Sequence, residues 1–63
     1  MRVGKLQSIP NEYSDFGRVI DEKGSSYTVE RGDVPKGAKV GDEFAYKVEI
    51  WGSGGLAYDL KDN

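Results

Sequence analysis

Residues 44–51 read Phe44-Ala45-Tyr46-Lys47-Val48-Glu49-Ile50-Trp51, with a large apolar side chain at every second position from Phe44 to Ile50. An alternation of period two is typical of a β-strand that buries one face and leaves the other in water. No segment of the chain shows a helical period over ten residues. We therefore predict a strand whose inward side chains are Phe44, Tyr46, Val48 and Ile50 and whose outward ones are Ala45, Lys47, Glu49 and Trp51.

Further short runs rich in Val, Ile, Tyr, Phe and Leu are separated by turn signals, among them the Gly/Ser-rich residues 52–55. This spacing is typical of strands joined by tight turns. The predicted strands cover residues 2–9, 16–21, 26–31 and 56–60, the last with Leu56, Tyr58 and Leu60 on one side. Because 63 residues cannot build a two-sheet sandwich with a full core, we predict one all-β domain over residues 1–63. Its expected form is a small five-stranded antiparallel barrel with no helix beyond a short turn.

The composition excludes several classes of function. The chain has no Cys and no His, so it lacks the usual zinc and iron–sulfur ligands and any Ser–His or Cys–His catalytic pair. Its acidic residues do not follow the spacing of a calcium loop. We expect no enzyme activity, no metal and no cofactor. No apolar run approaches the roughly 20 residues that span a bilayer, and Met1-Arg2-Val3-Gly4 does not open a signal peptide, so we expect a soluble cytoplasmic protein without a membrane partner.

Four landmarks follow one another in a characteristic order: Gly4-Lys5-Leu6, Phe16-Gly17-Arg18-Val19, Tyr27-Thr28-Val29-Glu30-Arg31 and Val40-Gly41-Asp42-Glu43-Phe44. Their order and spacing resemble the cold-shock domain family, a small OB-fold barrel that binds single-stranded RNA and DNA. The resemblance implies an OB-like barrel and an aromatic platform on which bases stack. The chain keeps one ring of that platform, Phe16, and has other residues at the remaining positions, which are Ser8, Ile9, Arg18, Thr28, Glu30 and Arg31. The resemblance therefore implies weak, salt-sensitive binding.

The candidate nucleic-acid-binding residues are Lys5, Tyr13, Phe16, Arg18 and Arg31. Alternation leaves open whether Phe16 points outward to stack on a base or inward to fill the core. Tyr13 either stacks on a base or folds onto the rim of the barrel. The three cations either form a basic strip that contacts phosphates or belong to a solvated face on which carboxylates answer each of them.

A second class of function remains open, because most of the aromatic platform is absent. The chain would then be a protein-interaction module, a small regulator on an OB-like barrel that has lost nucleic-acid binding. The candidate contact residues for a protein partner are Ile9, Ile20 and Trp51. Trp51 either anchors a partner or covers one end of the barrel.

Overall fold

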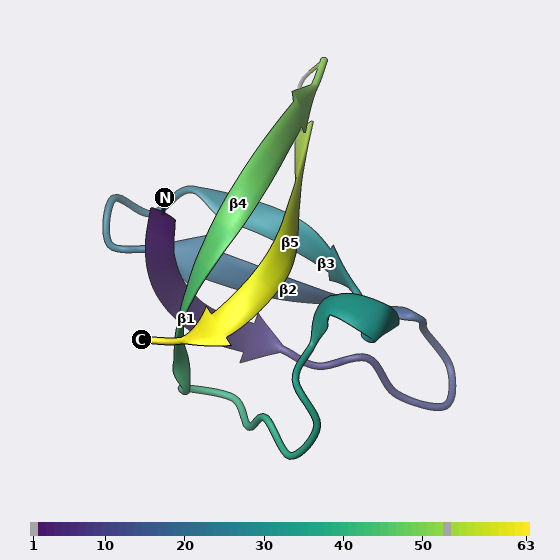
Figure 1. The fold of residues 1–63 in the computed structure, drawn as a ribbon. Coiled ribbons are helices and arrows are strands. Elements are labelled where there is room, and N and C mark those ends of the chain that lie inside the picture. The colour runs from purple at the N-terminus through teal and green to yellow at the C-terminus, as the bar shows by residue number, and fades with distance from the viewer. Residues whose placement is uncertain (1, 53) are drawn as a thin grey trace.

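The computed structural model describes residues 2–52 and 54–63, so Met1 and the Ser53 position of the predicted hairpin turn lie outside the described residues. Five strands form one sheet (Figure 1), and one 3-10 turn, η1 (Arg31–Asp33), follows the third strand. The strands are β1 (Arg2–Ser8), β2 (Phe16–Asp21), β3 (Ser26–Glu30), β4 (Glu43–Trp51) and β5 (Gly54–Asp62). The all-β prediction is confirmed. Within the described residues, no helix is long and apolar enough to cross a membrane.

Each strand pairs with two neighbours, so that the ladders close into a ring in the order β1-β2-β3-β5-β4. Four of the ladders are antiparallel, but β3 and β5 run parallel, with Thr28 beside Leu56 and Val29 beside Ala57. The prediction of a wholly antiparallel sheet is therefore wrong. A closed ring of five strands cannot alternate in direction all the way round, because five is odd and one neighbouring pair must run parallel.

The interior of the ring is filled by apolar side chains from all five strands. The buried cluster comprises Leu6, Val19, Tyr27, Val29, Phe44, Tyr46, Ala57 and Leu60. The rings of Tyr27 and Tyr46 meet edge to face, with their centroids 6.3 Å apart. Phe44 and Tyr46 are buried as predicted, and Val48 is partly buried against the same cluster.

Ile50 corrects the predicted register of β4, because its side chain is 58% exposed rather than inward. β1 pairs with β4 only along residues 43–46, so the end of β4 has β5 as its paired neighbour. There the two strands project as a hairpin beyond the rest of the ring (Figure 1). Ala45, predicted to face solvent, is buried, and its small side chain lies between Val3 and Lys61 in the two ladders.

The predicted apolar side of β5 is confirmed at Leu60 but is wrong at Tyr58, and Ala57 is the other buried residue of this strand. The register between β4 and β5 shifts where Asp59 adopts a φ of 58°. The extra residue of such a bulge breaks the period of two. Tyr58 therefore lies on the outside, 36% exposed.

The hydroxyl of Tyr46 is buried and has no hydrogen-bond partner among residues 2–52 and 54–63. A Cβ atom on residue 4 would lie 2.5 Å from this oxygen, so Gly4 leaves the space that the hydroxyl needs. Burial raises the pKa of Tyr46, and the charge of Asp21 raises it further. The hydroxyl therefore stays neutral in the folded protein over the ordinary pH range.

We expect Tyr46→Phe to leave the free energy of unfolding unchanged or to raise it by up to about 1 kcal/mol, because it removes a buried polar atom without a partner. Above about pH 10 the parent should lose more stability than the variant. The folded-state pKa is raised, so ionisation of Tyr46 favours the unfolded chain. Urea denaturation at neutral and alkaline pH measures both effects.

Tyr58→Phe is the control, since Tyr58 lies outside the core and its loss should change stability by less than about 0.5 kcal/mol. A loss of more than about 1 kcal/mol in Tyr46→Phe at neutral pH would contradict the expectation, because it would mean that the hydroxyl forms a stabilising hydrogen bond.

Candidate nucleic-acid interface

Phe16 and Arg18 lie on the outer face of β2, because Gly17 and Val19 are the residues that this strand buries. Phe16 is 53% exposed, so of the two arrangements that alternation allows the structure has the outward one. A flat aromatic ring on an open sheet surface can stack on a nucleobase of any sequence.

Gly17 is the residue that lets the chain after β1 lie close to β2. A Cβ atom at this position would lie 2.5 Å from the carbonyl oxygen of Ser8 and 3.0 Å from the ring of Pro10. Any larger residue would push the end of β1 and the following loop away from β2. Gly17 therefore allows residues 8–10 to lie close against β2.

Arg18 occupies the middle of this outer face, between Ser8 on β1 and Thr28 on β3. Its guanidinium donates a hydrogen bond to the hydroxyl of Ser26 over 3.2 Å. Among the residues that the structure describes, the cations in ion pairs are Arg31, Lys47 and Lys61, and Arg18 forms none. Its charge is therefore available to a phosphate.

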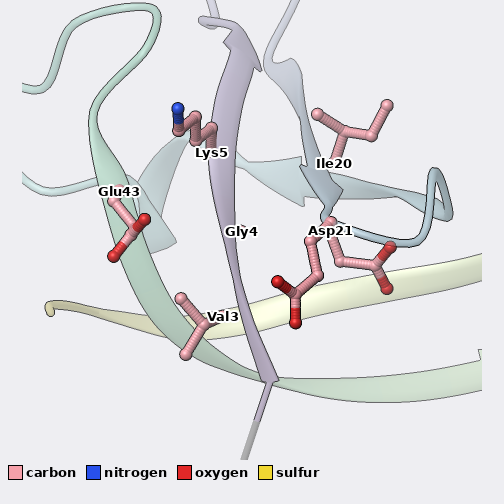
Figure 2. A pocket seen from close by; sticks show the side chains of 7 residues that line it. Val3, Gly4, Lys5, Ile20, Asp21 and Glu43 are labelled. Carbon is pink, nitrogen blue, oxygen red and sulfur yellow. The ribbon is translucent and has the colours of Figure 1, made fainter.

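Lys5 is exposed at the other end of the face, beside Ile20 in the ladder. Ile20 lies four positions after Phe16 on β2, which corresponds to about 13 Å along the strand. Lys5 borders a hollow of about 290 Å³, drawn in Figure 2, whose walls include Val3, Ile20 and the acidic residues Asp21, Glu22 and Glu43. A phosphate at this end would meet both signs of charge.

Tyr13 lies at the tip of a tight turn between β1 and β2, and its side chain is 89% exposed. The Asn11 side-chain oxygen accepts hydrogen bonds from the backbone N–H groups of Tyr13 (2.7 Å) and Ser14 (3.0 Å). Asn11 and Ser14 also pair through their backbones. The turn thus holds Tyr13 in solvent, and the aromatic side chain of Tyr13 does not fold back onto the ends of the strands.

Arg31 differs from Arg18, because its guanidinium is occupied by the protein. It pairs with Asp15 over 3.2 Å and donates hydrogen bonds to the backbone carbonyls of Asn11 and Ser14. The contacts of Arg31 therefore favour the second alternative given by the sequence, in which the charge of the cation is balanced by a carboxylate of the protein. Arg31 supports the loop that carries Tyr13.

The electrostatics near the aromatic rings are mixed. Glu30 is the direct cross-strand neighbour of Phe16, and both are exposed. Glu12 lies beside Tyr13 in the turn and is also exposed. These carboxylates make this end of the face unfavourable for a polyanion.

The three candidate protein-contact residues do not form one patch. Ile9, 42% exposed, lines a hollow at the end of β1 together with Val34 and Pro35, whereas Ile20 is partly buried in the wall of the hollow beside Lys5. Trp51 is 61% exposed on the projecting β4–β5 hairpin. Only Trp51 offers a large exposed apolar surface.

Two residues that shape the interface were not predicted. Asn11 is the side chain that folds the loop, and the signal was present, since Asn at the first position of a turn often bonds the backbone two residues on. Ser26, the partner of Arg18, carries no comparable signal, because only the register of β2 against β3 brings the two side chains together.

No known family model matches the chain, and no curated protein matches its sequence. Two exposed aromatic rings can stack on planar groups, and Arg18 and Lys5 can pair with anions. In residues 2–52 and 54–63, no group of three or more His, Cys, Asp or Glu residues is placed to hold a metal ion.

We expect Gly17→Ala to lower the free energy of unfolding by about 1–3 kcal/mol, since the new methyl group meets backbone that cannot move freely. Gly32→Ala is the matched control, because a Cβ atom at that position has no neighbour within 4 Å. Urea denaturation of both variants measures the difference. Equal midpoints for Gly17→Ala and the parent would show that the loop does not press on β2.

Proposed function

We propose that this chain is an OB-like barrel similar to the cold-shock domain and that it binds single-stranded RNA or DNA weakly. The support from the fold is the closed ring of five strands with the order β1-β2-β3-β5-β4. OB-fold proteins bind oligonucleotides on the face of their second and third strands and with the loop between the first two. Phe16, Arg18 and Tyr13 occupy these places in this chain.

The observation that carries the proposal is that Phe16 is exposed on the same face of β2 as Arg18, while a second exposed ring, Tyr13, lies in the preceding loop. Phe16 and Tyr13 are 53% and 89% exposed, and neither contributes to the buried cluster. Arg18 follows Phe16 on the same face without a carboxylate partner among the described residues. Stacking and phosphate contacts together are the usual means of binding single strands without sequence preference.

The same geometry limits the strength of binding. Each stacked base contributes about 1–3 kcal/mol, and two rings together with Lys5 and Arg18 support a Kd in the micromolar range or weaker. Lys5 and Arg18 supply charge, while Glu30 and Glu12 oppose it. Binding should therefore depend steeply on salt, because phosphate contacts release counterions.

Titration of labelled oligo-dT and oligo-U at low and moderate salt tests the proposal. We expect Phe16→Ala to weaken binding about tenfold at constant salt, which is the loss of one stacked base. Arg18→Ala should weaken binding and reduce the slope of log K against log salt by about one. Lys61→Ala, on the far end of β5, is a charge-matched control that should leave affinity nearly unchanged. Absence of binding at about 100 μM protein and low salt would exclude the proposed function.

Glu30→Gln should tighten binding. The substitution keeps the shape of the side chain and removes the negative charge beside Phe16, so we expect an increase of about two- to fivefold at low salt that fades as salt screens the charge. Glu49→Gln changes the net charge equally but lies on β4, and it should have less than half this effect. Equal effects of the two variants would mean that only net charge matters and that nucleic acid does not lie against Phe16.

A protein partner is the second candidate function, and the projecting hairpin favours it. Ile50 and Trp51 are 58% and 61% exposed at its end. Exposed Trp is a frequent anchor of protein interfaces. In the oligonucleotide titration, a change in Trp51 fluorescence that Phe16→Ala abolishes supports the nucleic-acid proposal, whereas failure to bind leaves the hairpin as the surface to pursue.

A further inference from the structure

Arg31 connects the end of β3 to a loop that lies 16 to 20 residues earlier in the sequence. Its Nε donates to a carboxylate oxygen of Asp15 over 3.2 Å, and its terminal nitrogen donates to the carbonyl oxygens of Asn11 and Ser14, the latter over 3.2 Å. Its backbone N–H donates to the carbonyl of Asp15 over 2.8 Å. Arg31 thus holds both ends of the turn, Asn11 and Ser14, and also Asp15, which follows the turn.

These contacts surround Tyr13 without touching its ring. Asn11 and Ser14 flank the tip of the turn, and the guanidinium of Arg31 donates hydrogen bonds to the carbonyl oxygens of both. The ring of Tyr13 remains 89% exposed. An exposed loop without such support would sample many conformations, and a ligand would have to order it on binding.

We infer that Arg31 is a positioning residue that presets the Tyr13 turn for stacking on a base and does not itself contact phosphate. The inference rests on the proposed function, since it assigns Tyr13 a role in binding single strands. The planar guanidinium suits this task because it reaches three acceptors in fixed directions, which an ammonium group cannot do. Its charge is already matched by Asp15, so it adds little attraction for a phosphate backbone.

Two variants separate positioning from direct contact. Arg31→Lys keeps the charge but loses the planar fork, and Arg31→Ala loses both. We expect each to weaken oligo-dT binding about three- to tenfold, with a salt slope equal to that of the parent. Recovery of the parent affinity in Arg31→Lys, or a salt slope lower by about one in Arg31→Ala, would overturn the inference, because either result indicates a phosphate contact.

A double-mutant cycle adds a second test. If Arg31 acts through Tyr13, Arg31→Ala should change affinity less than twofold in a Tyr13→Ala background, because coupled residues are not additive. Equal effects in both backgrounds would contradict the inference. Asp15→Asn, which removes the ion pair and keeps the backbone acceptors, should give a smaller loss than Arg31→Ala in the parent background.

The order of the turn in the free protein tests the inference independently of binding. We expect the ¹⁵N order parameters of Tyr13 and Ser14 to be about 0.8 in the parent and in Arg18→Ala, and to fall below about 0.6 in Arg31→Ala. Unchanged values in Arg31→Ala would overturn the inference even if the parent binds oligo-dT. If the parent binds no oligonucleotide while the order parameters fall as expected, the proposed function fails and with it the role assigned to Tyr13, although Arg31 still holds the turn.

Discussion

One neighbouring pair of strands must run parallel in any closed ring of five, and in this chain β3 and β5 form that pair. Only two residue pairs make up the ladder, Thr28 with Leu56 and Val29 with Ala57, and the side chains of Val29 and Ala57 are fully buried beneath it. Without this short ladder, β1 to β3 would be an open meander with an unpaired edge, and the core would lose one wall. Burial of Val29 and Ala57 and closure of the ring therefore depend on each other.

Closure also determines which residues can meet a ligand. Because the interior takes one side of every strand, the outer face of β1 to β3 must carry the remaining side chains, and Phe16 and Arg18 are among them. Gly17 lets the end of β1 and the start of the following loop lie close against β2. Glu30 lies on the same face beside Phe16, so the surface that presents an aromatic ring also carries a charge that opposes phosphate.

Arg18 and Arg31 show how far residue type predicts a role. Both are exposed cations close to the candidate interface, and residue type and position in the sequence do not distinguish their roles. Within residues 2–52 and 54–63, Arg18 donates to one hydroxyl and forms no ion pair, whereas Arg31 is held by Asp15 and two backbone carbonyls. The difference arises because the end of β3 lies against the β1–β2 loop, a contact between segments distant in sequence.

Alternation and turn residues are local signals, so the amino-acid sequence was enough to predict the all-β class, the approximate positions of the five strands and the inward side chains of β4 as far as Val48. The parallel pair, the exposure of Ile50 and the bulge at Asp59 could not be predicted, since each depends on which strands lie opposite one another in the fold. The orientation of Phe16 was decided in the same way. Both parities of β2 offer apolar residues, and burial of Val19 against neighbouring strands selects one of them.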